Sequence, residues 1–187
     1  MTVPRRRLGL PPMFSLLAVL AVTAWFFLSA SVAQADRRQI SDGNDVSGRL
    51  DIRSASHGHA GARLVHRIST FGTWGNRLVR RSGTNLFSLD ISTDGDRRPE
   101  RVVLIYSRNG RIIADVFRFS GGNLTLIGSA SASRPNARTV RVSIRRSRLG
   151  NPGRYRWNVY SQYKNAGACS NFCVDRAPNR GRVLHDI

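Results

Sequence analysis

Residues 102–119 read VVLIYSRNGRIIADVFRF, and this stretch decides the fold class. Val102 to Tyr106 is apolar on both faces, which is typical of a central strand that is covered on both sides. Arg108-Asn109-Gly110-Arg111 contains Asn-Gly, the strongest short signal for a β-hairpin turn. Ile112 to Phe119 is therefore predicted to return beside the first strand as its antiparallel partner.

The same alternation of apolar and polar residues continues along the chain. Val140 to Ile144 and Tyr155 to Val159 both alternate, and arginines occupy most of the polar positions. Further strands are predicted near residues 50–52, 64–71, 86–91 and 124–127, with glycine-rich turns between them, including one at residues 57–61. About eight short strands and no convincing amphipathic helix predict an all-β protein, a single antiparallel β-sandwich.

The first 35 residues have the pattern of an export signal. Arg5–Arg7 form a basic start, Met13 to Leu28 carries no charge, and Ala33-Gln34-Ala35 is a small-x-small cleavage site. This predicts a signal peptide over 1–35, a flexible segment over 36–46 and the β-sandwich domain over 47–187, in a secreted or cell-surface protein. The alternative is a retained membrane anchor, because the apolar stretch is long enough to span a bilayer; cleavage would leave no stable span.

The two cysteines, Cys169 and Cys173, lie in the C-terminal segment. An even cysteine count in an exported protein predicts a disulfide. A redox-active pair, the alternative, usually has the tighter C-x-x-C spacing. We therefore expect a structural disulfide that holds a local turn.

The charge of the chain is strongly positive. It has 30 Lys+Arg against 11 Asp+Glu, a net charge of +19, and Lys164 is the single lysine. Such an excess favours an anionic partner: a cell-wall polymer, an acidic glycan, nucleic acid or a membrane surface. A high-GC genome would explain arginine in place of lysine, but not the excess over acidic residues.

Two stretches carry a resemblance to known proteins. Residues 87–96 (FSLDISTDGD) and 147–157 (SRLGNPGRYRW) resemble small exported bacterial β-sandwich proteins of unassigned function and, more remotely, the DOMON and family 9 carbohydrate-binding sandwiches. The shared features are a D-x-D-type turn after a strand and a late strand, Leu-Gly, turn and aromatic strand. The resemblance covers about residues 50–163 and implies a binding module. The haem ligands and sugar-stacking tryptophans of those families have no matching positions here.

An acidic turn is the first candidate site. Asp90, Asp94, Asp96 and Glu100 surround a glycine and offer the hard oxygen ligands that Ca²⁺ prefers. The alternative is an ordinary polar turn, in which the aspartates accept hydrogen bonds from local amides and neighbouring arginines neutralise the carboxylates.

A histidine group is the second candidate site. His57 and His59 share one side of an extended segment, and a turn at residues 60–63 would bring His66 beside them. Three converging imidazoles suit Zn²⁺ or Cu²⁺. The alternative is a solvated turn with one strand histidine, because no fourth ligand follows nearby.

An arginine and aromatic surface is the third candidate site. Arg141, Arg145, Arg154 and Arg156 are predicted to point outward, with Tyr160 in line with the last two. Sugars or bases stack on such aromatic rings while arginines hold anionic groups. The alternative is a solvated sheet face. Trp157 is predicted to lie in the core.

Evidence for catalysis is thin, because the sequence contains no G-x-S-x-G, H-E-x-x-H or P-loop motif. The predicted function is a non-catalytic extracellular binding module for an anionic or glycan ligand. A metal-binding extracellular protein is one alternative. A secreted hydrolase that uses Glu100 or Asp115 is the other.

Overall fold

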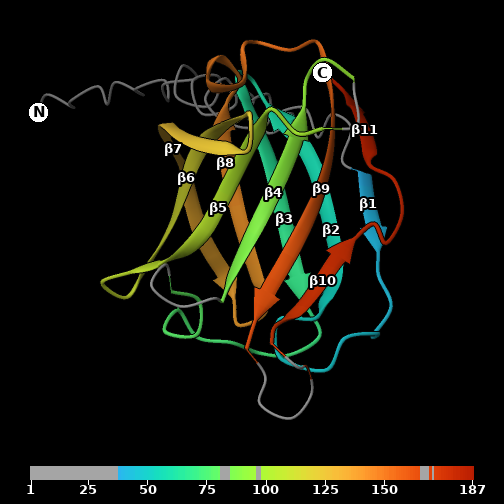
Figure 1. Ribbon diagram of the computed structural model, residues 1–187, viewed down its shortest axis with the longest axis vertical. Coiled ribbons are helices and arrows are strands. Elements are labelled where there is room, and N and C mark those ends of the chain that lie inside the picture. The colour runs from blue at the N-terminus through green and yellow to red at the C-terminus, as the bar shows by residue number, and fades with distance from the viewer. Residues whose placement is uncertain (1–37, 81–84, 96–97, 165–168, 170) are drawn as a thin grey trace, which may run out of the picture. The chain divides into compact units, whose positions relative to one another are not determined.

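The computed structural model describes residues 38–80, 85–95, 98–164, 169 and 171–187 (Figure 1). The predicted signal peptide lies outside this range. The described residues form eleven strands, one 3-10 helix and no α-helix, and none of their helices could cross a membrane. The elements are β1 (Arg38–Ser41), β2 (Ile52–Ala60), β3 (Arg63–Thr70), β4 (Leu86–Ser92), β5 (Arg101–Arg108), β6 (Arg111–Ser120), β7 (Asn123–Asn136), β8 (Thr139–Arg145), η1 (Arg146–Leu149), β9 (Arg154–Tyr163), β10 (Cys173–Ala177) and β11 (Val183–Asp186).

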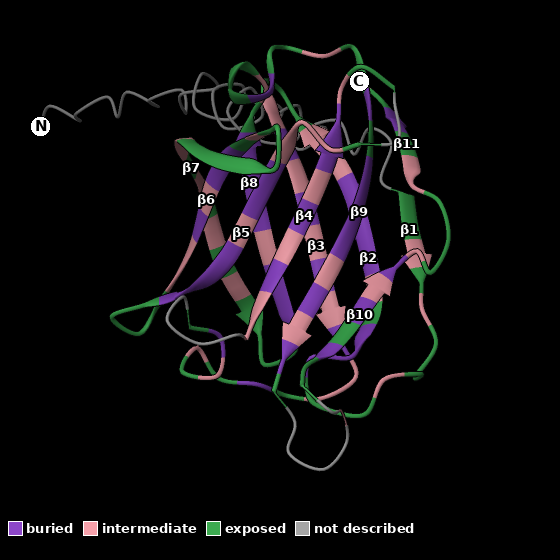
Figure 2. Ribbon diagram, viewed as in Figure 1, coloured by how far each residue is buried: buried purple, intermediate pink, exposed green. Residues whose placement is uncertain are grey.

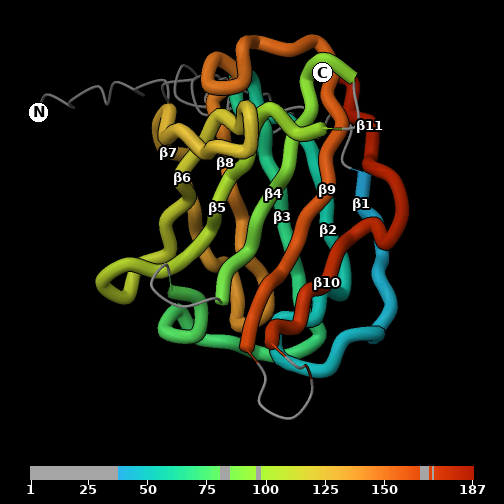
Figure 3. The backbone as a smooth tube through the Cα atoms, in the orientation of Figure 1, coloured from blue at the N-terminus to red at the C-terminus, as the bar shows by residue number. Residues whose placement is uncertain are grey.

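These strands form one continuous hydrogen-bonded path in the order β1-β2-β3-β8-β7-β6-β5-β4-β9-β10, with β11 also beside β9. All ladders between the named strands are antiparallel. The long strand β7 joins the two halves, because residues 123–130 pair with β6 and residues 131–136 pair with β8. The sheet curls over, so that β4, β5 and β9 lie in front of β2, β3 and β8 (Figures 1 and 3).

The prediction of an all-β, antiparallel protein is confirmed. Eleven strands replace the expected eight, and they follow one curled path where two separate sheets were expected. The deciding hairpin is confirmed as β5 and β6, with Arg108 opposite Arg111. Asn109 and Gly110 have φ values of 51° and 75°, the left-handed conformations that a type I′ turn requires.

The core lies between the two layers of the curled sheet. Buried and partly exposed residues alternate strictly along β3, and nearly so along β4 (Figure 2). Trp157 of β9 is fully buried, as predicted, and contacts β2 and β3 of the opposite layer through the rings of His57 and His66. Trp74 covers the core in the loop after β3, where its ring packs against Phe87.

Two local predictions differ from the structure. Residues 57–60 belong to β2, so the turn between β2 and β3 is shorter than expected. The segment expected to be flexible, 36–46, contains β1, which pairs with β2 over four residues. The segment is polar and has no apolar alternation that would predict a strand. Its order comes from backbone hydrogen bonds to the edge of β2.

The disulfide is confirmed. Cys169 and Cys173 are bonded across a sequence separation of 4 residues, with Cα atoms 5.4 Å apart. Cys173 begins β10 and is buried, so the bond fixes the chain where it enters this strand.

Candidate functional site

Four arginines form two cross-strand pairs on the outer surface of β3 and β8. Arg63 lies opposite Arg145, and Arg67 lies opposite Arg141. All four are partly or fully exposed, because the alternating residues of both strands fill the core. We call these four residues the arginine face. Like charges directly opposite one another destabilise a sheet, so this arrangement costs folding energy.

Mostly small residues surround the arginine face. The adjacent outward positions of β2, β7 and β8 are serines, a threonine, a glycine and Ala60, and Val65 lies between the two arginine pairs. The strands β1, β2, β3 and β8 contain no acidic residue. Arg63 donates hydrogen bonds to the backbone and side-chain oxygens of Ser143. Ser69 and Thr139 continue the face with a hydroxyl–hydroxyl bond of 2.9 Å.

The face ends at an open hollow of about 330 Å³. Its lining has hydroxyl groups and two guanidinium groups but no carboxylate, and consists of Arg53, Ser69, Thr70, Thr73, Asn136, Ala137, Arg138 and Thr139. The hollow and the four arginines together form a surface that presents positively charged hydrogen-bond donors and neutral groups, with no carboxylate among these residues. Such a surface suits phosphate, sulfate or carboxylate groups.

The structure divides the five residues of the predicted arginine and aromatic surface into two sets. Arg141 and Arg145 lie on β8, whereas Arg154, Arg156 and Tyr160 lie on β9, and these strands are not neighbours. A guanidinium group, from Arg176, already lies 5.8 Å from the centre of the Tyr160 ring.

Arg154 and Arg156 line a different hollow, of about 420 Å³, together with Asp94. The carboxylate of Asp94 makes this hollow less suitable for an anion than the hollow beside β3 and β8.

Glu100 organises the acidic turn through backbone hydrogen bonds. Its carboxylate accepts the N–H groups of Thr93 at 2.8 Å and Asp94 at 3.3 Å. The Ser92 hydroxyl donates to Asp94 at 3.1 Å. Burial, followed by the hydrogen bond with Asp94, raises the pKa of Glu100. These contacts correspond to the ordinary polar turn that we considered as the alternative to a calcium site.

Asp90 lies apart from that turn. It faces Asn158 across the β4–β9 ladder, and burial raises its pKa to about 6 although Arg182 and Arg176 act against the rise. Asp96 lies outside the described residues. The ligand atoms of Asp90, Asp94 and Glu100 do not lie within 4.8 Å of one another, so these three described side chains are not arranged as a chelating group.

The histidine group comes together as predicted, but in the core. His57 and His66 are directly opposite on β2 and β3, with ring centres 6.5 Å apart. His185 of β11 joins them, with its ring centre 4.0 Å from that of His57 and 5.8 Å from that of His59. His57, His66 and His185 are each 1% exposed. All four histidines of the chain thus gather between the two layers; no local sequence pattern pointed to His185.

Hydrogen bonds engage two of these rings. The Trp157 indole N–H donates to Nδ1 of His57 at 2.8 Å, and the Tyr155 hydroxyl bonds Nε2 of His66 at 2.8 Å. Burial, then the neighbouring His57 and His185, lowers the pKa of His66 well below its usual value. Within the described residues, no three of the imidazoles bring ring nitrogens within 4.8 Å of one another. The arrangement is that of a polar core network, and the Zn²⁺ or Cu²⁺ site remains a prediction.

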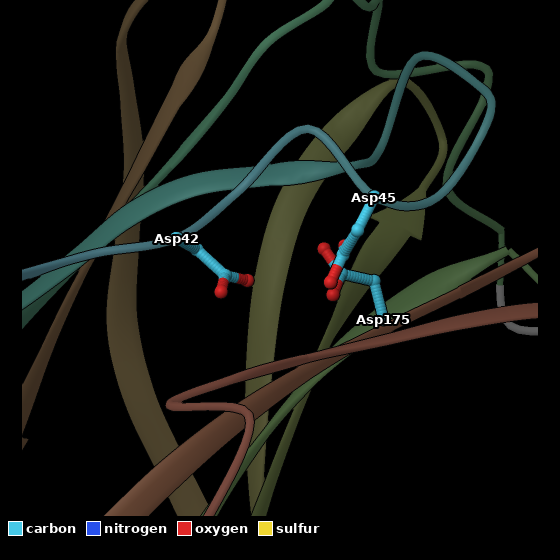
Figure 4. A group of neighbouring side chains, drawn as sticks. All are labelled: Asp42, Asp45 and Asp175. Carbon is cyan, nitrogen blue, oxygen red and sulfur yellow. The ribbon is translucent and has the colours of Figure 1, made fainter.

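A group that the sequence analysis missed does have chelating spacing. The carboxylates of Asp42, Asp45 and Asp175 offer oxygens that all lie within 4.8 Å of one another (Figure 4). The run Asp42-Gly-Asn-Asp45 is a sequence signal for such a site, but Asp175 is too distant in the chain to be joined to it without the fold.

The residues of the hydrolase alternative are both engaged in local contacts. Asp115 on β6 accepts a hydrogen bond from the Tyr106 hydroxyl of the adjacent strand. Glu100 holds the turn described above. The structure thus supplies structural roles for both carboxylates, and catalysis remains a prediction.

Comparison with known proteins adds no assignment: no protein-family model and no curated protein sequence matches this chain. The functional argument therefore depends on the geometry of the chain itself.

Proposed function

We propose that this chain is an exported, non-catalytic protein that binds an anionic polymer through its arginine face. The observation that carries the proposal is the pairing of Arg63 with Arg145 and of Arg67 with Arg141, in strands that contain no acidic residue. An anionic group between two opposed guanidinium groups would convert their repulsion into attraction.

The spacing of the two arginine pairs favours a polymer over a small anion. Arg63 and Arg67 are four residues apart on one strand, which separates the pairs by about 13 Å. The hollow beyond Ser69 and Thr139 extends the same surface through Arg53 and Arg138. A ligand with anionic groups at intervals would contact both pairs and the hollow at once.

The class of ligand follows from charge and location. The predicted export signal and the disulfide favour an extracellular setting, in which acidic glycans and phosphate-bearing cell-wall polymers are the abundant polyanions. Guanidinium groups bind phosphate, sulfate and carboxylate in a two-pronged geometry. The resemblance of residues 87–96 and 147–157 to carbohydrate-binding sandwiches also favours a glycan.

The test compares two variants that lose the same charge. Arg67→Ser/Arg141→Ser removes one pair of the face, and Arg108→Ser/Arg111→Ser removes an opposed, exposed pair at the tip of the β5–β6 hairpin. Affinity for heparin, a purified wall polymer and DNA would be measured over a range of salt concentrations. We expect the face variant to bind the preferred polymer about tenfold more weakly, and the hairpin variant to change by about twofold or less.

The outcome distinguishes a specific face from general charge. Equal weakening in both variants would show that binding follows net charge alone and would contradict the proposal. Preference for DNA over both glycans, with the face variant affected, would keep the face but change the ligand. For a specific face, the slope of binding against salt should also fall in the face variant.

A further inference from the structure

Four of the ten aspartates in the chain gather where the segment after β1 meets β10. Asp42 and Asp45 lie in that segment, Asp51 directly precedes β2, and Asp175 lies within β10. Figure 4 shows the Asp45 and Asp175 carboxylates side by side, with Asp42 pointing toward them. The oxygens of these three side chains lie within 4.8 Å of one another, which is the spacing of ligands around one ion.

Asp51 supplies an independent observation. Its side chain is 0% exposed, and no N–H or hydroxyl group of the described residues donates a hydrogen bond to its carboxylate, whose hydrogen-bonding neighbour is the carboxylate of Asp175. Its electrostatic neighbours are Asp175, Asp45 and Asp42, in order of decreasing effect. A buried carboxylate directed at other carboxylates is costly unless a positive charge compensates it.

No guanidinium group of the described residues donates a hydrogen bond to these carboxylates, although the sequence has 30 Lys+Arg residues. The groups that donate to the cluster are neutral: the backbone N–H groups of Ile52 and Arg176 bond Asp175, and the Asn179 side chain bonds Asp45 at 3.1 Å. This strongly acidic locus in a very basic protein is thus left without a cation from the residues that the structure describes.

We propose that Asp42, Asp45 and Asp175 bind a divalent metal ion, with Ca²⁺ as the preferred ion and with the buried carboxylate of Asp51 beside the site. The ligands are all hard carboxylate oxygens, with no histidine or cysteine among them, which favours Ca²⁺ or Mg²⁺ over zinc and copper. Backbone carbonyls of residues 42–48 can complete the six to eight oxygens that Ca²⁺ takes, whereas Mg²⁺ demands a stricter octahedron.

The ion would act as a structural clamp. The Ile52 N–H bond to Asp175 already joins β2 to β10, which stand near opposite ends of the strand path. An ion shared by the segment after β1 and by β10 would hold these ends together and relieve the repulsion between the carboxylates. The site is separate from the arginine face, so failure of one proposal leaves the other standing.

The first experiment measures the melting temperature of the chelated protein on addition of Ca²⁺, Mg²⁺ or Zn²⁺. We expect Ca²⁺ to raise the melting temperature by about 5–10 °C at 100 times its Kd, and Mg²⁺ to raise it less. Asp45→Asn should abolish the Ca²⁺ response. The matched control is Asp94→Asn, in the acidic turn, which should keep it.

Asp51→Asn tests the physical reason for the site. The amide removes one buried charge and provides a donor for Asp175. We therefore expect this variant to melt above the wild-type protein in chelator and to respond more weakly to Ca²⁺, because one negative charge beside the ion is gone. If Asp51→Asn does not fold, Asp42→Asn and Asp45→Asn decide the question.

Two results would overturn the proposal. One is a melting temperature that does not respond to Ca²⁺ up to about 10 mM, tenfold above the Kd of weak extracellular calcium modules. The other is a response that Asp45→Asn retains and Asp94→Asn loses, which would assign the ion to the acidic turn. The first result, together with stabilisation by Asp51→Asn, would indicate that Asp51 and Asp175 share a proton instead.

Discussion

Buried polar side chains of this protein bond to aromatic partners across the two layers of the sheet. His57 accepts a hydrogen bond from Trp157, and His66 bonds the Tyr155 hydroxyl. Because Nδ1 of His57 accepts, the proton of the neutral ring lies on Nε2. Each contact joins β9 to a strand of the opposite layer, so these residues help to fix how the layers face one another.

Replacing Trp157 by Phe should reveal this contribution. The change removes the donor to His57 and leaves a small cavity, and we expect it to lower the free energy of unfolding by about 3 kcal/mol. Trp74→Phe is the matched control, because the buried Trp74 indole N–H has no hydrogen-bond partner among the described residues. Urea denaturation of both variants measures the difference; equal losses would mean that volume alone accounts for the effect.

At the level of elements, local signals predicted the strands well and their neighbours less well. Asn109-Gly110 specified the β5–β6 hairpin, and the alternation in residues 140–144 specified β8. The pairing of β3 with β8 joins segments more than 65 residues apart, which no local pattern encodes. The extended strand β7 likewise has mostly small and polar residues where it crosses between the halves, so its role as the joint was not predictable.

The same limit explains the outcome for the candidate sites. His57, His59 and His66 lie on one hairpin, and their convergence could be predicted from strand geometry. His185 and Asp175 reach their partners only because β11 and β10 both pair with β9. Arg63 and Arg67 could not be predicted as part of this surface, because the outward Val65 and the inward His66 break the alternation of polar and apolar residues in β3.

The turn of the deciding hairpin can be tested with one substitution. Gly110→Ala places a side chain at a φ of 75°, and we expect it to lower the free energy of unfolding by about 1 kcal/mol. Gly153→Ala is the control, because that glycine has no positive φ and no atom of the described structure lies within 4 Å of the place its added methyl group would take. Thermal or urea unfolding measures both. A loss in Gly153→Ala as large as in Gly110→Ala would contradict this account of the turn.

At the scale of the whole molecule, stability depends on pH through two kinds of buried group: aspartates whose pKa is raised and a histidine whose pKa is lowered. Asp42 and Asp51 have raised pKa values, of about 6 and 7, so in the metal-free protein their contribution is present at low pH and is lost as the pH rises through those values. His66 has a lowered pKa, because burial and the neighbouring His57 and His185 disfavour its charged form. Its contribution is present above about pH 6.5 and is lost as the pH falls.

The contribution of His66 can be separated from that of the aspartates by comparing the free energy of unfolding of the wild type with that of His66→Gln. His66→Gln keeps a hydrogen-bond partner for the Tyr155 hydroxyl but cannot take up a proton in this pH range. We expect this variant to be less stable than the wild type at pH 7.5 and to lose less stability on acidification to pH 5. Urea denaturation of both metal-free proteins at several pH values measures the difference, in which the aspartates cancel. A difference that stays constant with pH would show that His66 does not titrate with unfolding.

The order of strands in the sheet also imposes an order in time. During synthesis, β3 can pair with β2 at once but with β8 only after that strand has been made. In the same way, β4 can pair with β9 only after β9 has been made. The four aspartates are all present only when residue 175 has been synthesised, 133 residues after Asp42. A nascent chain therefore passes through a long interval in which its first three strands exist without their partner layer. The aspartates could therefore bind an ion only after β10 has reached the segment that follows β1, which makes ion binding a late step in folding.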